Sequence, residues 1–183
     1  MSEPSLPEKI LAIDRALAGA GIAHAFGGAL ALAYYAEPRA TIDIDVNIFL
    51  APAGYPAVEG ALGTLGVQGG VDQGRVEREG QCRMDWGGTP IDLFFAYDAL
   101  HEAMRGAIRR EPFGEASIPV LAPEHLLVCK AVFDRPKDWL DIEQVVLCVE
   151  DLDTGEVLAW LDRILDPGDP RRGRFERLVG VGG

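Results

Sequence analysis

The sequence contains little cysteine, little basic charge and no long hydrophobic run. Its three cysteines are odd in number and show no Cys-x-x-Cys spacing, which argues against a disulfide framework and a zinc knuckle. The longest run of small and apolar residues, 25–36, is shorter than the roughly 20 residues that cross a bilayer. Residues 1–8 are polar and lack the features of a signal peptide. We therefore expect a cytoplasmic protein that makes no contact with a membrane.

Basic residues are outnumbered by acidic ones, with 17 Lys and Arg against 29 Asp and Glu and a formal net charge of −12. Long-range electrostatics should then repel nucleic acid, so we expect no extended nucleic-acid surface. A local exception is an arginine-rich segment, made up of Arg171, Arg172, Arg174 and Arg177. This segment could touch RNA, or it could be a solvated basic tail.

The length and the hydrophobic periodicity predict one mixed domain. A chain of 183 residues can bury a core without disulfides or structural metal. Both strand and helix periods occur in residues 1–120, whereas residues 121–165 are helical, which indicates an α+β class. Residues 166–183, rich in Gly, Pro and Arg, are expected to be a loose tail.

Caps, breakers and periodicity predict the individual elements. Helices are expected at 5–19, opened by a capping box of Ser5 and Glu8, and at 29–36, 55–65, 98–105, 123–133, 137–149 and 154–165. Strands are expected at 22–26, 39–50, 81–86 and 90–96, with a hairpin turn at 87–89 and a short strand pair around 113–115.

Asp43 and Asp45 are the strongest chemical feature of the sequence. Positions two apart on a strand point the same way, with roughly 6.5 to 7 Å between their Cα atoms. Two such carboxylates can share Mg²⁺, and Asp92 on a later strand would be a third. Three carboxylates can hold two ions about 3.5 to 4 Å apart for in-line displacement at phosphorus. The alternative is a solvated strand face with Arg39 as a surface ion partner.

Gly27 and Gly28 lie between a predicted strand and a predicted helix. A diglycine there would let a phosphate approach the backbone closely, near the free N–H groups of the helix start. The alternative is a tight turn that only needs a positive φ.

In combination these motifs resemble the nucleotidyltransferase superfamily, which has a DNA polymerase β-like fold. The resemblance lies in Phe-Gly-Gly-Ala-Leu-Ala-Leu at 26–32, Arg-Ala-Thr-Ile-Asp-Ile-Asp-Val at 39–46 and Ile-Asp-Leu at 91–93. The Arg-x-Thr-x-Asp-x-Asp form is similar to the branch of AbiEii-type toxins and antibiotic nucleotidyltransferases. Residues 122–130 and 135–142 resemble the helical segment of that branch. The resemblance covers about residues 23–142 and implies a mixed sheet flanked by helices, with a helical C-terminal half.

The resemblance assigns roles to the motif residues. It implies that Gly27 and Gly28 bind the triphosphate and that Asp43 and Asp45 hold Mg²⁺, as two ions, with Mn²⁺ as a possible substitute. Asp92 would complete the metal site and act as, or orient, the base for the acceptor hydroxyl.

Four further residues are candidates for phosphate contacts, each with a structural alternative. Thr41 lies on the face of the aspartates, but it could be an ordinary strand threonine. Arg39 could bind phosphate through two N–H groups or neutralise the acidic face. Lys130 and Lys137 could reach phosphate from the helical part, although Lys137 and Asp141 also form an i,i+4 pair.

The function that the resemblance implies is transfer of an NMP from an NTP to a hydroxyl acceptor, with release of pyrophosphate. A small molecule, a tRNA end or a protein side chain could be the acceptor. One alternative is the toxin component of a toxin–antitoxin pair, which would act with an antitoxin partner. Another is a non-catalytic nucleotide-binding module.

Overall fold

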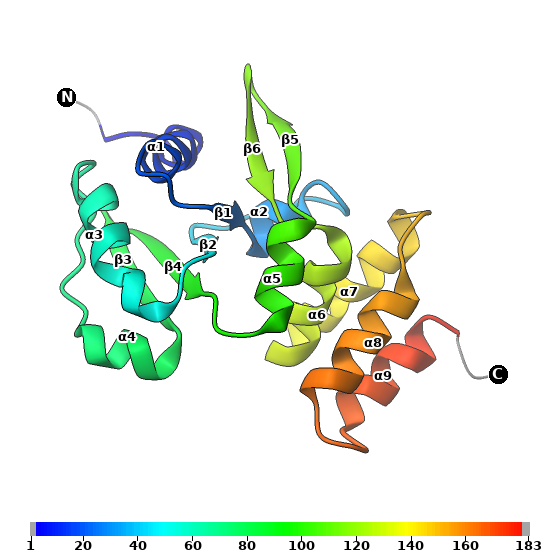
Figure 1. The fold of residues 1–183 in the computed structure, drawn as a ribbon. Coiled ribbons are helices and arrows are strands. Elements are labelled where there is room, and N and C mark those ends of the chain that lie inside the picture. The colour runs from blue at the N-terminus through cyan, green and yellow to red at the C-terminus, as the bar shows by residue number, and fades with distance from the viewer. Residues whose placement is uncertain (1–2, 181–183) are drawn as a thin grey trace. The chain divides into compact units, whose positions relative to one another are not determined.

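A computed structural model describes residues 3–180, which form two compact units (Figure 1). Unit 1 comprises the chain up to Leu30 together with Ala40–Leu121. Unit 2 comprises Ala31–Arg39 and the chain from Ala122 onward. The expected change from sheet to helices after residue 120 falls beside this division. The single domain that the sequence predicted is divided there into two units.

Unit 1 contains a mixed sheet with the strand order β3-β4-β2-β1-β6-β5. Its strands are β1 (His24–Phe26), β2 (Ile44–Ile48), β3 (Gln81–Trp86), β4 (Thr89–Phe95), β5 (Arg109–Phe113) and β6 (Ala116–Val120). β2 runs parallel to β4 and antiparallel to β1, and β3 and β4 form the predicted hairpin. The strands β2 and β4, which carry Asp45 and Asp92, are therefore direct neighbours in the middle of the sheet.

Unit 1 also contains helices. They are α1 (Leu6–Gly19), α3 (Tyr55–Gly63), which follows the short 3₁₀ helix η1 (Pro52–Gly54), α4 (Gln73–Glu79) and α5 (Ala99–Gly106). The predicted capping box is confirmed, because the Glu8 carboxylate accepts hydrogen bonds from the backbone N–H and the hydroxyl of Ser5, both at 2.7 Å. α1 packs against α3, β1 and β6. The N-terminal helix thus helps to cover the sheet.

Lys9 of α1 is buried, with 2% of its surface exposed. Its ammonium donates hydrogen bonds to the Glu3 carboxylate, the Trp86 carbonyl and the Thr89 hydroxyl at 2.5 to 2.9 Å. A buried ammonium needs such partners because its desolvation is costly. Lys9 therefore ties α1 to the β3–β4 hairpin by polar contacts.

Three elements of unit 1 and its border differ from the predictions. α2 (Gly28–Leu32) ends four residues before the predicted Ala36. Residues 39–43, predicted as strand, precede β2, because the pairing with β4 starts only at Ile44. Alternating hydrophobicity does not make a strand where no neighbouring strand takes up the backbone hydrogen bonds. α4 was not predicted, because its polar sequence shows no helical hydrophobic stripe.

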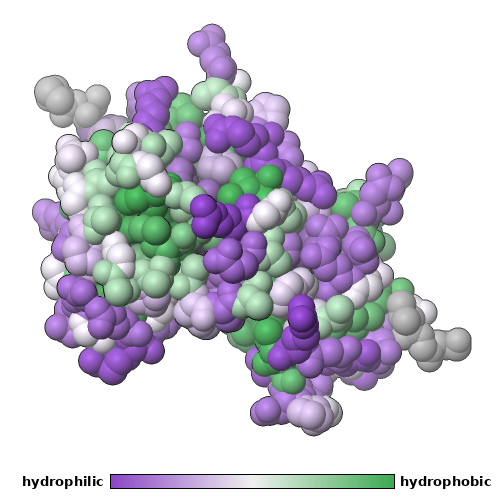
Figure 2. All heavy atoms as spheres, in the orientation of Figure 1, coloured by the Kyte–Doolittle hydropathy of each residue, from purple (hydrophilic) through white to green (hydrophobic). Residues whose placement is uncertain are grey.

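Unit 2 is a helical bundle of α6 (Pro123–Phe133), α7 (Pro136–Cys148), α8 (Thr154–Ile164) and α9 (Pro170–Leu178), with α6 packed against the other three. Trp139, Leu161 and Phe175 are buried in its core. The visible face of these helices is largely hydrophilic (Figure 2), as expected for helices that bury one apolar face. Within residues 3–180, no helix is long and apolar enough to cross a membrane.

α9 corrects the prediction of a loose tail at residues 166–183, of which 181–183 lie outside the described part. The Asp169 side chain caps this helix by accepting a hydrogen bond from the Arg171 N–H, and the Phe175 side chain is fully buried. The sequence pattern concealed the helix because a single apolar anchor does not make a periodic stripe.

The arginine-rich segment lies on α9 and makes contacts within unit 2. Arg171 pairs with Asp169 and donates a hydrogen bond to the Val132 carbonyl. Arg172 pairs with Asp162 and Glu176. The guanidinium of Arg174 lies 4.2 Å from the ring centre of Trp139. These intramolecular contacts account for three of the four arginines without RNA.

Candidate active site

The sheet of unit 1 brings Asp45 and Asp92 together. In the parallel pairing of β2 with β4, Asp45 is the register partner of Asp92, so both side chains leave the same face of the sheet. Asp43 lies just before β2, two residues from Asp45. We call Asp43, Asp45 and Asp92 the carboxylate cluster. The structure therefore assembles three residues that lie up to 49 positions apart in the sequence.

Arg83 on β3 binds this cluster and was not predicted from the sequence. It is the register partner of Asp92 in the antiparallel β3–β4 pair. Its Nε and Nη2 donate hydrogen bonds to the two Asp92 carboxylate oxygens at 2.7 and 2.6 Å, and its Nη2 lies 4.0 Å from Asp43 Oδ2. The hydrogen bond to Asp92, aided by the charges of Asp43 and Asp45, raises the pKa of Arg83. The predicted turn at 87–89 would have placed Arg83 opposite position 93, whereas in the structure Trp86 pairs with Thr89 and this register brings Arg83 opposite Asp92.

Gly28 lies directly against the carboxylate cluster. Its φ of +53° is in the left-handed region, and a Cβ there would come within 1.7 Å of Asp45 Oδ2. The Gly27 N–H donates a hydrogen bond to the Asp45 carbonyl at 2.9 Å, and a Cβ on Gly27 would come within 2.8 Å of Asn47 Nδ2. The diglycine thus serves as a tight turn and also keeps the space beside Asp45 free of side chains.

Thr41 supports the segment that leads to Asp43. Its hydroxyl accepts a hydrogen bond from the Asp43 N–H at 3.3 Å and lies 3.4 Å from the Asp43 carbonyl, to which it can donate. A threonine that bonds to a backbone two residues ahead stabilises a turn. The side chain of Thr41 therefore orients the backbone of Asp43, a role that needs no ligand.

The carboxylate cluster has the donor chemistry of a site for a hard divalent cation. Carboxylate oxygens are the ligands that Mg²⁺ prefers, and the Arg83 guanidinium shows that a cation is drawn to this face. In the described part of the chain, however, no three His, Cys, Asp or Glu side chains converge on one point as metal ligands do. Both oxygens of Asp92 are directed to Arg83 instead.

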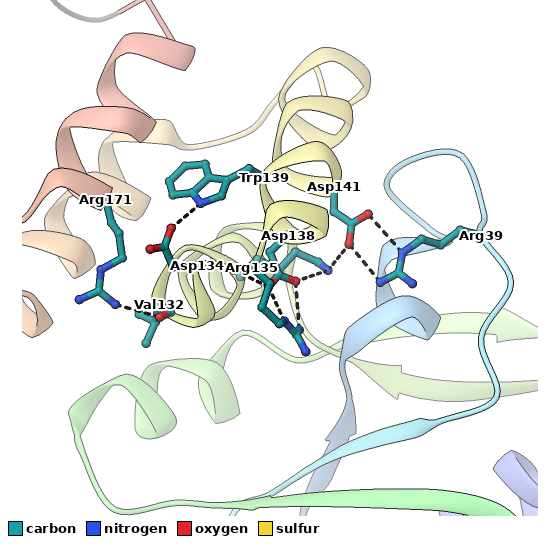
Figure 3. Close-up of polar contacts among 9 residues, drawn as sticks. Arg39, Val132, Asp134, Arg135, Asp138, Trp139, Asp141 and Arg171 are labelled. Carbon is teal, nitrogen blue, oxygen red and sulfur yellow. Dashed lines mark hydrogen bonds and ion pairs between the residues drawn. The ribbon is translucent and has the colours of Figure 1, made fainter.

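Arg39 and Lys130, two of the predicted phosphate contacts, belong to an ion-pair network inside unit 2. Figure 3 shows Arg39 directed to Asp141 and Arg135 directed to Asp138. The Lys130 ammonium lies 2.6 Å from Asp141 Oδ2 and 3.8 Å from Asp138 Oδ1. Arg39 donates two hydrogen bonds of 3.2 Å to Asp141, and Arg135 binds Asp138 at 2.6 and 3.0 Å. We call these five residues the ion-pair network. Its contacts account for the burial of Lys130 without any ligand, whereas Lys137 is exposed.

A second polar contact fixes the turn between α6 and α7 (Figure 3). Asp134 ends α6 with a φ of +55° and accepts a hydrogen bond of 2.6 Å from the indole N–H of Trp139. Aspartate tolerates the left-handed region better than most residues do. The buried Trp139 is therefore structural in unit 2.

No family model and no curated protein matches this sequence. Among solved structures, a solution structure of the antibiotic-resistance factor ANT(2'')-Ia has a TM-score of 0.61 at 16% identity, and the match covers 94% of each chain. A crystal structure of ANT(2'')-Ia in complex with adenylyl-2''-tobramycin has a TM-score of 0.57 at 16% identity, covering 92% of this chain and 95% of that one. The predicted nucleotidyltransferase-like α+β fold is therefore confirmed.

Proposed function

We propose that the protein is a metal-dependent nucleotidyltransferase that moves an NMP from an NTP to a hydroxyl acceptor. The observation that carries the proposal is the contact of Gly28 with Asp45, whose register partner is Asp92. It joins the glycine turn and the carboxylates into one site, where a phosphate chain could meet backbone and carboxylates together. The likeness in fold to ANT(2'')-Ia supports the same proposal.

Each residue of the site has a chemical task in this proposal. Gly27 and Gly28 let the triphosphate approach the backbone, while Asp43, Asp45 and Asp92 would hold Mg²⁺. When bound, Mg²⁺ supplies positive charge that offsets the negative charge of the phosphates. The Asp92 carboxylate orients the acceptor hydroxyl and accepts its proton. The hydroxyl oxygen then bonds to the α-phosphorus, the bond from that phosphorus to the bridging oxygen breaks, and pyrophosphate leaves.

We propose a small hydroxylated molecule as the acceptor, in preference to tRNA or a protein. The net charge of −12 disfavours a long anionic acceptor and favours a cationic one. The complex of ANT(2'')-Ia with adenylyl-2''-tobramycin supports an adenylyl group as the group transferred and a molecule such as tobramycin as its acceptor.

Transfer from α-labelled NTPs tests the proposal directly. Each of the four NTPs is incubated with Mg²⁺ and with tobramycin, total tRNA or a protein mixture, and labelled products are separated from pyrophosphate. We expect Asp45→Asn and Asp92→Asn to lower the rate on the order of 10²-fold or more, because charge stabilisation at phosphorus is lost. Asp85→Asn, an exposed change on β3, is the matched control and should keep the rate. Undiminished transfer by both cluster variants would overturn the proposal.

A non-catalytic nucleotide-binding module is a second candidate, because Arg83 already engages both oxygens of Asp92. Thermal unfolding with each NTP separates the two candidates. A nucleotide at 100 times its Kd stabilises the fold by about 2.7 kcal/mol. Stabilisation without transfer to any acceptor would favour the module. The AbiEii-type toxin with an antitoxin partner stays a prediction from the sequence.

A further inference from the structure

Arg83 is a charged residue at the carboxylate cluster to which the proposed reaction gives no task. Its guanidinium binds both oxygens of Asp92 and lies 4.0 Å from Asp43. The Arg83 side chain is 62% exposed, whereas that of Asp92 is 18% exposed. An exposed side chain therefore holds a less accessible carboxylate, and it can leave without unpacking the core.

The contact meets an electrostatic need of the cluster. Three carboxylates on one face repel one another unless a positive charge lies among them. Arg83 is influenced by all three, since its pKa is raised by Asp92 first and then by Asp43 and Asp45. A bidentate guanidinium and a hard divalent cation seek the same carboxylate oxygens, so the two exclude each other at Asp92.

We propose that Arg83 is an internal counter-ion, which stabilises the carboxylate cluster without metal and competes with a divalent cation for Asp92. This inference rests on the proposed function only in that the cluster is a metal site. It explains why the cluster shows no convergent metal ligands among residues 3–180 although its donor set suits Mg²⁺. Arg83 must release Asp92 before this carboxylate can serve as a metal ligand.

Titration with Mn²⁺ alone, followed by electron paramagnetic resonance, measures this competition without any nucleotide. We expect Arg83→Gln to lower the Kd for Mn²⁺ on the order of fivefold, since an exposed ion pair opposes binding by about that factor. Arg83→Lys keeps the charge but loses the bidentate geometry, so its Kd for Mn²⁺ should lie between those of the wild type and Arg83→Gln. Arg75→Gln is the matched control: it removes the same charge from another exposed ion pair of unit 1, with Glu79, and should bind Mn²⁺ as the wild type does.

Thermal unfolding of the same proteins shows whether the Arg83→Gln variant is folded. In EDTA, Arg83→Gln should unfold about 2 to 4 °C below the wild type, because the carboxylates then lack their counter-ion. In millimolar Mg²⁺ this deficit should disappear. If Mg²⁺ raises the Tm of the variant more than that of the wild type, the variant is folded and its cluster needs a cation.

The outcomes separate this inference from the proposed function. Equal Mn²⁺ affinity in the wild type and Arg83→Gln would overturn the role of Arg83 and leave the metal site standing. Failure of every protein to bind Mn²⁺ would overturn the inference together with the metal site. Tighter Mn²⁺ binding by Arg83→Gln supports the inference, even where no NTP and acceptor yield a transfer product and the proposed function fails.

Discussion

The two units each pair aspartates with arginine, but they do so at different depths. In unit 1, Arg83 binds Asp92 on an exposed strand face. In unit 2, Asp138 and Asp141 are buried with Lys130, and Arg39 and Arg135 bind them from the outside. An exposed pair can exchange its cation for another, whereas a buried pair cannot lose its partner without a large cost.

The comparison separates candidate binding groups from structural ones. The sequence suggests a metal site at the Asp-x-Asp motif and phosphate contacts at Lys130 and Lys137. Burial distinguishes them, because Lys130 is only 4% exposed and has carboxylate partners at 2.6 and 3.8 Å. The carboxylate cluster therefore remains the candidate for chemistry, and the ion-pair network is a candidate for stability.

Lys130→Met should have the largest effect on stability. It leaves the buried Asp138 and Asp141 without their ammonium, which should cost about 3 kcal/mol of unfolding free energy. Lys137→Met removes an exposed lysine of the same unit and should change stability by less than about 0.5 kcal/mol. Urea unfolding of both variants measures the difference. Equal stability of the two would contradict the structural role of Lys130.

Gly28→Ala should come next, at about 2 to 3 kcal/mol. Its Cβ requires both a left-handed backbone and displacement of the Asp45 carboxylate. Gly88→Ala in the β3–β4 turn has a φ of +76° with open space around the new Cβ, so it should cost only about 1 kcal/mol. Chemical denaturation of both variants separates the cost of a left-handed alanine from the cost of the collision with the Asp45 carboxylate. A Gly28→Ala cost no larger than that of Gly88→Ala would show that the Asp45 carboxylate moves aside freely.

Arg39→Gln should cost about 1 kcal/mol, because Asp141 keeps Lys130 as its partner. The KM for the NTP should stay within about twofold of the wild type, since an unaltered phosphate site leaves binding energy unchanged. Steady-state kinetics with the donor, together with urea unfolding, test both expectations. A raised KM with unchanged stability would support the phosphate contact that the sequence predicts for Arg39.

His125 should make the stability of the protein depend on pH. It is buried in unit 2 with its Nε2 3.3 Å from Glu156 Oε1, and neither ring nitrogen forms a hydrogen bond within the described residues. Burial lowers its pKa despite the nearby charges of Glu156 and Glu124. The unfolded chain then binds the proton more readily than the folded chain does. The contribution of His125 to stability is therefore fully present above about pH 6.5 and is lost on acidification through the lowered pKa. The free energy of unfolding falls by at most about 1.4 kcal/mol per pH unit.

Urea unfolding between pH 7.5 and pH 5 checks this expectation. His125→Gln should flatten the dependence in that range, since it removes the titrating group. His101→Gln on α5 of unit 1 is the control for loss of a histidine and should leave the slope at His125 in place. Stability that rises on acidification in the wild type would contradict the assignment.

The sequence predicted most elements because they depend on local rules. The capping box at Ser5, the hairpin turn predicted at 87–89 and the prolines that open α6 and α7 are signals within a few residues. Elements that depend on distant partners were predicted less well. α2 ends early, β2 starts late and α9 is held by Phe175 in a core that the local pattern does not show.

The same distinction between local signals and distant partners applies to the candidate site. The sequence by itself identified the candidate residues for chemistry, because Asp43, Asp45, Asp92 and the diglycine are recognisable from residue type and spacing. Only the tertiary structure decided their partners. Strand register places Arg83 on Asp92, and burial commits Lys130 to Asp141. The physical reason is that a charge interacts with whatever lies within a few ångströms, and that neighbourhood is set by packing between segments far apart in the chain.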